Sequence, residues 1–270
     1  MKKQSLLSPG DYIKKLAERV YSLGFFDAEA WLGRTDDFPL MQEGDIDIFR
    51  VLLIRHSMKG CLISHWLHKN SFDNCYTVKE SNEKVVRNIE KLENSYGIIT
   101  ALPLFPKEDW LIDHPKVKAV RIYPDAFSFR LADWCTGSLC DMLVEKKMPL
   151  FIFHTEVDFN DLYLTAKKFP QLKIVLESQV RKLIYHARQV LPLMKECPNI
   201  SLEISNWTGP GFIEYTARSI GSERMVFGSF MPANDPLASM GAVALTELPE
   251  ADKKKIAGGN ILEMIAEVRR

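Results

Sequence analysis

The sequence has 270 residues, with 35 basic and 35 acidic side chains, 46% hydrophobic residues and 26% charged residues. These are the values of a globular protein, and they exclude the disordered and fibrous classes. Zero net charge and a pI near 7.0 argue against a nucleic-acid binder or a protein of the membrane surface, so we expect neither as a partner.

Helical and strand-like segments alternate along the chain. A first helix is predicted over residues 11–23, where apolar residues recur at helical spacing between an N-cap aspartate and the stop signal Gly24. Eight short apolar runs are then typical of strands, over residues 25–29, 60–66, 96–104, 117–124, 148–156, 172–178, 199–205 and 224–230. Amphipathic stretches predict helices over residues 46–58, 81–94, about 139–143, 160–169, 180–196, 212–219 and 256–269.

The runs are rich in Val, Ile, Leu and Phe with few polar interruptions, which indicates parallel strands buried on both faces. Eight such units predict an α/β protein, a single (β/α)8 TIM barrel over residues 1–270 with an extra N-terminal helix. A doubly wound open sheet is the alternative. It is weakened because no Gly-rich phosphate loop follows any strand, and we interpret residues 258–260 as the start of a helix.

In such a barrel the active site forms at the carboxyl ends of the strands. The first strand brings Asp27, Glu29 and Trp31, which are two residues apart and are expected to point to the same side. The later strands end with His65 and Trp66, Arg121 and Tyr123, His154 and Glu156, Glu177 and Ser178, Glu203 and Ser205, and Gly228, Ser229 and Phe230.

Each candidate has a functional and a structural interpretation. Asp27 and Glu29 fit a ligand pair or a general base, and equally a solvated rim. His154, which follows the apolar run 150–153, is the strongest catalytic candidate, with a hydrogen-bonded core histidine as the alternative.

The remaining candidates concern substrate binding. Arg121 and Tyr123 suit a substrate carboxylate, because arginine offers a bidentate fork. An internal ion pair of Arg121 with Glu29 or Glu177 explains the arginine nearly as well. Trp31 and Phe230 suit an apolar pocket, although core packing is the commoner use of aromatic residues.

Several segments together resemble the amidohydrolase superfamily, in the branch related to aminocarboxymuconate-semialdehyde decarboxylase. The resemblance runs from residue 25 to residue 265. It is carried by FFDAEAWLG (25–33), MPLFIFHTE (148–156), FPQLKIVLES (169–178), NISLEIS (199–205), RMVFGSF (224–230) and IAGGNILEMI (256–265). The resemblance implies a TIM barrel and either a metal-bound water that attacks an ester or amide, or a metal-assisted decarboxylation.

The resemblance also implies metal ligands that this chain does not have. The family pattern Asp-x-His-x-His-x-Gly has Glu29 and Trp31 in place of its histidines, and only His154 matches a ligand of the later strands. Ser178 and Phe230 stand where the family has a histidine and an aspartate. Because zinc sites need about three protein ligands, we expect no metal and no other cofactor.

Three hypotheses follow. The first is a metal-independent hydrolase or lyase for a small carboxylate, ester or lactone, with His154, Glu29 and Asp27 catalytic and Arg121, Tyr123, Trp31, Glu177 and Phe230 binding substrate. The second is a non-catalytic barrel that binds a small molecule or a partner. The third is a divalent-metal enzyme rebuilt on Asp27, Glu29, His154 and Glu177, with zinc, magnesium or manganese as the less expected cofactor.

Cysteine usage and the first residues concern location. The five cysteines are irregularly spaced and form no C-x-x-C motif, so a disulfide scaffold and a zinc knuckle are both disfavoured. The apolar run near the start is too short for a signal peptide. We therefore expect reduced thiols in a cytoplasmic protein, and the resemblance adds the expectation of a homodimer.

Overall fold

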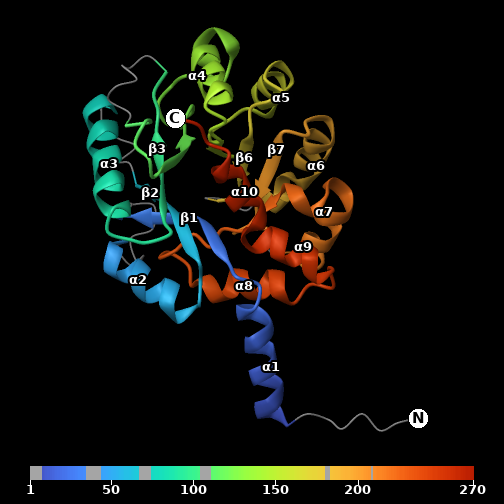
Figure 1. Ribbon diagram of the computed structural model, residues 1–270. Helices are drawn as coiled ribbons and strands as arrows, with labels where there is room; N and C mark the ends of the chain where they lie inside the picture. The colour runs from blue at the N-terminus through green and yellow to red at the C-terminus, as the bar shows by residue number, and fades with distance from the viewer. Residues whose placement is uncertain (1–7, 35–43, 67–73, 104–110, 180–182, 208) are drawn as a thin grey trace.

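Eight parallel strands, hydrogen-bonded in sequence order, form the wall of a barrel (Figure 1). The computed structural model describes residues 8–34, 44–66, 74–103, 111–179, 183–207 and 209–270. The strands are β1 (Phe26–Leu32), β2 (Gly60–His65), β3 (Tyr96–Thr100), β4 (Val117–Arg121), β5 (Leu150–Phe153), β6 (Ile174–Glu177), β7 (Ile200–Glu203) and β8 (Met225–Val226). The segment after β8 returns to β1, because the Trp31 amide donates to the Met231 carbonyl oxygen (2.9 Å).

Helices connect most of the strands and surround the barrel (Figure 1). The α-helices are α1 (Pro9–Tyr21), α2 (Ile46–Arg55), α3 (Asn74–Ile89), α4 (Asp133–Glu145), α5 (Phe159–Lys168), α6 (Ala187–Glu196), α7 (Phe212–Ile220), α8 (Pro236–Ala244), α9 (Glu250–Lys254) and α10 (Asn260–Ala266). Short 3₁₀ turns span Leu183–His186 and Ser222–Arg224, and a π-helical turn spans Lys255–Gly259. Asp45, Asp158 and Asp235 cap α2, α5 and α8 by accepting hydrogen bonds from their first turns.

Apolar side chains fill the amino-terminal end of the barrel. Residues from seven of the strands and from α10 form one buried cluster, which contains Phe26, Ala28, Leu62, Ile98, Ala119, Phe151, Val175, Val226, Ile261, Met264 and Ile265. Other strand residues pack against the surrounding helices in a second, larger cluster. Both faces of the strands are therefore buried, as the near-continuous apolar runs predict.

The predicted fold class, an α/β barrel of one domain with an N-terminal helix outside it, is confirmed. The details differ at the C-terminal end. The structure has α8, which we did not predict, and the predicted helix over residues 256–269 is the second part of a helical stretch that begins at Glu250. Residues 258 and 259 therefore lie inside a helix and not at its start. Residue 104 of the predicted third strand and residues 180–182 of a predicted helix lie outside the described residues.

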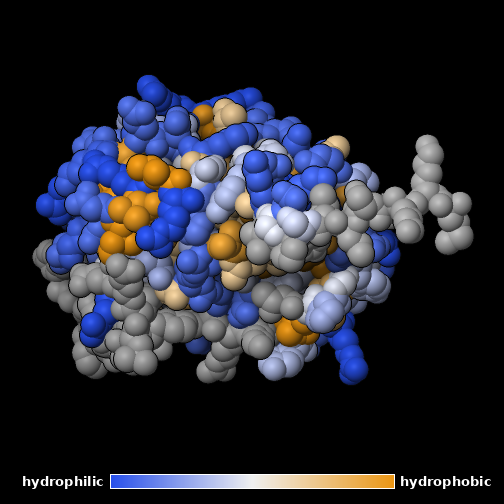
Figure 2. Space-filling model, turned by 90° about the horizontal axis from the view of Figure 1, so that it is seen from below, coloured by the Kyte–Doolittle hydropathy of each residue, from blue (hydrophilic) through white to orange (hydrophobic). Residues whose placement is uncertain are grey.

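The N-terminal helix α1 extends away from the barrel beside α8 (Figure 1). Seen from that end, the surface is largely hydrophilic, and its hydrophobic side chains gather in separate patches (Figure 2). In the part of the chain that the structure describes, no helix has the length and apolar character that crossing a membrane requires.

Candidate functional site

The centre of the barrel holds a buried layer of polar and charged side chains above the apolar cluster. Glu29, Arg121, Glu177 and Glu203 are each at most 1% exposed. A further cluster, of mostly aromatic residues, covers this layer, and we call it the aromatic layer: Trp31, Trp66, Val78, Leu102, Tyr123, Phe153 and Phe230. Charged groups therefore lie between two apolar layers, where each charge needs a partner.

The Arg121 guanidinium is bound from several sides. Its Nε donates to Glu177 Oε2 (2.9 Å), one terminal nitrogen donates to Glu177 Oε1, and the other donates to Ser64 Oγ. Its Cζ atom lies 4.2 Å from the centroid of the Trp31 ring and 5.3 Å from that of Phe153. The carboxylate takes two of its N–H edges while an indole covers one face, which is the geometry that favours arginine over lysine. Of the two interpretations that the sequence left open, the internal ion pair with Glu177 is observed.

The aromatic layer is closely packed around Trp31. The Trp31 ring stacks on Trp66 at 4.1 Å between centroids and on Phe153 at 5.6 Å, and Phe230 meets it edge-on at 6.1 Å. Trp31 is fully buried, and Phe230 is 1% exposed. Tyr123 packs near Phe153, at 6.1 Å. These residues pack together above Arg121.

Glu29 lies in the polar layer. Neither of its carboxyl oxygens makes a hydrogen bond of normal geometry to a described residue, because the nearby Ser205 hydroxyl donates to Glu203. Burial raises the pKa of Glu29 well above its ordinary value, and the charges of Glu203 and Glu177 raise it further, while Arg121 and the Ser205 hydroxyl act in the opposite direction. The folded structure therefore favours the protonated, uncharged form of this carboxyl.

Glu203 is held by backbone and hydroxyl donors. Its Oε2 accepts from the Ser178 amide (3.1 Å), the Ser178 hydroxyl (3.1 Å) and the Ser205 hydroxyl (3.0 Å), and its Oε1 accepts from the Ser205 amide. Burial raises the pKa of Glu203 to about 7, although the hydrogen bonds oppose the shift. Gly228 lies so close that a Cβ there would overlap the Glu203 carboxyl, which explains the glycine.

Asp27 has other partners, because β1 is irregular. The register with β2 shifts between Asp27 and Ala30, which interrupts the alternation expected of a regular strand. The Asp27 carboxylate accepts from the amides of Glu29 (2.9 Å) and Ser229 (3.0 Å) and from the Ser229 hydroxyl. Burial raises its pKa to about 6. Asp27 thus joins β1 to the segment after β8.

His154 follows β5 and is 5% exposed. Its Nδ1 lies 3.2 Å from the Glu177 carbonyl oxygen, and its ring lies 5.7 Å from that of His186. The structure therefore brings the side chains of Glu29, Arg121, Glu177 and Trp31 together. Asp27 is bonded instead to Ser229, and the His154 ring contacts the backbone of Glu177. Among the residues that the structure describes, no three His, Cys, Asp or Glu side chains are placed to hold a metal ion.

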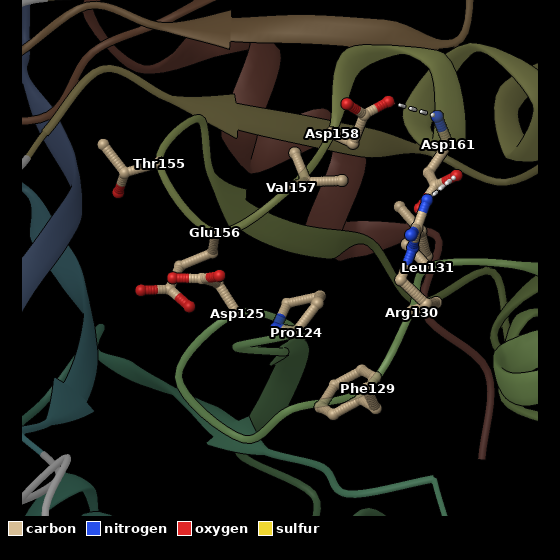
Figure 3. A pocket seen from close by; sticks show the side chains of 10 residues that line it. All are labelled: Pro124, Asp125, Phe129, Arg130, Leu131, Thr155, Glu156, Val157, Asp158 and Asp161. Atoms are coloured by element: carbon tan, nitrogen blue, oxygen red, sulfur yellow. Dashed lines mark hydrogen bonds and ion pairs between the residues drawn. The ribbon is translucent and has the colours of Figure 1, made fainter.

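A cavity of about 340 Å³ opens at the carboxyl-terminal end of the barrel, between the segments that follow β4 and β5 (Figure 3). We call it the rim cavity. It is lined by Pro124, Asp125, Phe129, Arg130, Leu131, Thr155, Glu156, Val157, Asp158 and Asp161. The two segments are joined there, because the Asp125 amide donates to the Glu156 carbonyl oxygen (3.2 Å) and the Ala126 amide donates to Glu156 Oε2 (2.9 Å).

The lining of the rim cavity is acidic. It has four carboxylates and one guanidinium, and that guanidinium, of Arg130, donates to both carboxylate oxygens of Asp161 at 2.6 Å and 2.9 Å. Asp158 is engaged as the cap of α5. The sequence pointed to Glu156. Asp125 lies in the loop after β4, whereas Asp158 and Asp161 lie at the start of α5, and no signal in the sequence brings these two segments together.

Comparison with known proteins gives the family. The profile of the family described as Amidohydrolase matches residues 107–265, which is more than half of the chain. The chain belongs to this amidohydrolase family. The resemblance found in the sequence is thereby confirmed, whereas a comparison with curated proteins finds no match.

Solved structures share the barrel. A 5-carboxyvanillate decarboxylase from Sphingomonas paucimobilis has a TM-score of 0.70 at 12% identity, over 90% of this chain and 99% of that chain. A dihydroxybenzoic acid decarboxylase from Polaromonas sp. JS666, solved with bound manganese and the inhibitor 2-nitroresorcinol, has a TM-score of 0.67 at 14% identity, over 90% and 97%. A 4-oxalomesaconate hydratase from Rhodopseudomonas palustris has a TM-score of 0.63 at 15% identity, over 90% and 96%. At these identities the similarity shows the fold of the amidohydrolase family and not a shared substrate.

Proposed function

We propose that this chain is a metal-independent member of the amidohydrolase family that binds a small molecule at the rim cavity. The observation that carries the proposal is the Arg121 guanidinium, which lies at the barrel centre between the Glu177 carboxylate and the Trp31 ring. The barrel centre then has a structural role, and the small molecule binds near the carboxyl ends of β4 and β5.

The residues at the centre do not fit a divalent ion. A zinc site needs about three protein ligands and an open position. Here Trp31 and Phe230 stand at two of the ligand positions of the family pattern, and both are packed into the aromatic layer. The Glu177 carboxylate is engaged on both oxygens by Arg121. We therefore infer that most of the family's metal ligands have been lost.

The charge of the rim cavity favours one class of ligand. Its four carboxylates outnumber its one guanidinium, and that guanidinium is already paired with Asp161. The lining therefore repels a carboxylate ligand. Phe129, Leu131 and Val157 supply apolar wall. A small organic cation with an apolar body therefore matches the cavity better than the carboxylate substrate expected from the sequence.

A chemical-shift titration of isotopically labelled protein tests this proposal with benzylamine and benzoate, which have the same ring and opposite charge. We expect benzylamine to shift the backbone signals of Thr155 and Val157 and benzoate to leave them unchanged, because only the amine complements the carboxylates. The Asp125→Asn/Glu156→Gln variant should lose the response.

Glu223→Gln is the matched control, since Glu223 is exposed and precedes β8 at the opposite end of the barrel. It removes one negative charge without touching the cavity, and it should bind benzylamine like the wild type. Benzoate binding without benzylamine binding would contradict the proposed ligand class.

A second candidate, a metal-independent hydrolase or lyase, is favoured by Glu29. A buried carboxyl whose pKa is raised has the properties of a general acid. A screen of lactones and esters with the wild type, Glu29→Gln and His154→Asn distinguishes this candidate, because turnover that survives both substitutions removes both residues from the mechanism. The homodimer and the cytoplasmic location stay predictions from the sequence.

A further inference from the structure

We propose that Arg121 is the resident cation of the barrel centre, a built-in guanidinium that neutralises the buried carboxyl layer in place of a bound ion. The inference rests on the proposed function, because it supplies the reason why this chain needs no divalent ion there. The sequence alone left two interpretations of Arg121 open, substrate binding and an internal ion pair, and this inference assigns it a structural role.

The first argument is the enclosure of the guanidinium. Arg121 is 1% exposed, yet it reaches groups from three other strands: Glu177 at the end of β6, Ser64 in β2 and Trp31 in β1. A cation held by ligands from several strands joins those strands at the centre. Arginine suits this role because its planar group presents N–H donors at its edge and stacks on aromatic rings through its faces.

The second argument is charge balance. The buried layer contains three glutamates close enough to interact electrostatically, Glu29, Glu177 and Glu203, and one cationic side chain among the described residues. One guanidinium balances one carboxylate, and Glu177 is the one that it contacts directly. Burial favours the protonated forms of Glu29 and Glu203, so the layer approaches neutrality without an added ion.

This role makes a prediction that a merely structural arginine does not. If the centre requires a guanidinium, removing the Arg121 side chain should leave a hole that free guanidinium ion fills. We would refold Arg121→Ala with and without low millimolar guanidinium chloride, a concentration too low to denature, and use sodium chloride at the same ionic strength as the reference. Unfolding would be followed by circular dichroism.

The expected result is a saturable rise in the melting temperature of Arg121→Ala by about 2–4 °C in guanidinium, as a ligand at some ten times its dissociation constant gives. The wild type should show no rise, because its own side chain fills the site. The Arg121→Ala/Glu177→Ala variant should show none either, because the carboxylate that would hold the ion is gone. A response to guanidinium no larger than that to sodium overturns the proposal.

Two further measurements complete the test. If Arg121→Ala folds under neither condition, the Arg121→Lys variant is measured in its place, because lysine keeps the charge but lacks the planar fork. A melting temperature below that of the wild type supports the proposal, and a melting temperature equal to it overturns the proposal. Manganese chloride added to the wild type tests the proposed function separately. Stoichiometric uptake would refute metal independence, whereas no uptake together with no guanidinium rescue would refute only the role of Arg121.

Discussion

The Glu177→Gln variant should lose on the order of 3–5 kcal/mol of the free energy of unfolding, because it leaves the Arg121 guanidinium buried without its carboxylate. Both oxygens of Glu177 accept from Arg121, and neither residue is more than 1% exposed. Urea titration of the wild type and the variant measures the difference.

A surface ion pair provides the control. Lys146 and Asp113 are 2.6 Å apart, but the Asp113 side chain is 78% exposed, so Asp113→Asn should change stability by less than about 1 kcal/mol. The Arg121→Met/Glu177→Leu variant, which replaces both charges by apolar groups of similar size, should recover much of the lost stability. A loss below about 1 kcal/mol in Glu177→Gln would show that the buried pair contributes no more to the free energy of unfolding than a surface ion pair does.

The second large effect is a fall in stability as the pH rises. Burial raises the pKa of Asp27 from 3.8 to about 6 and that of Glu203 from 4.5 to about 7. A carboxyl with a higher pKa in the folded chain binds its proton more tightly there, so its stabilising contribution is complete below the unfolded pKa and disappears as the pH passes the folded one. Each carboxyl contributes on the order of 3 kcal/mol.

We therefore expect the free energy of unfolding, measured in urea, to decrease between about pH 4 and pH 7. The Asp27→Asn variant should show a smaller decrease in the free energy of unfolding at the lower pH values of this range. Asparagine does not titrate, and its oxygen can still accept from the amides of Glu29 and Ser229. A stability that rises steadily over the same range would contradict the proposal that protonated carboxyls lie at the barrel centre.

The fold could be predicted because its signals are local and repeated. Eight apolar runs separated by amphipathic segments leave few alternatives to a barrel. Helix α8 was missed although Asp235 and Pro236 supply a cap and a first-turn proline, because its apolar residues do not follow one helical stripe. The boundaries of the last helix were wrong because a π-helical turn carries the chain through Gly258 and Gly259.

The site could be predicted only in part. Position at the strand ends identified Arg121, Glu177 and Trp31, but a sequence cannot show whether an arginine faces a ligand or a neighbouring strand. The irregular register of β1, which separates the partners of Asp27 from those of Glu29, depends on pairing with β2 and β8 and leaves no local pattern. The rim cavity is formed by two loops that are adjacent only in the folded chain.

Elemental analysis of the wild-type protein, purified without a histidine tag and then dialysed against manganese or zinc, tests the central claim most directly. Because a guanidinium already neutralises the Glu177 carboxylate, we predict no stoichiometric divalent metal and an unchanged melting temperature in chelator. One tightly bound ion per chain, whose removal lowers the melting temperature, would contradict the claim that Arg121 is the cation of the barrel centre.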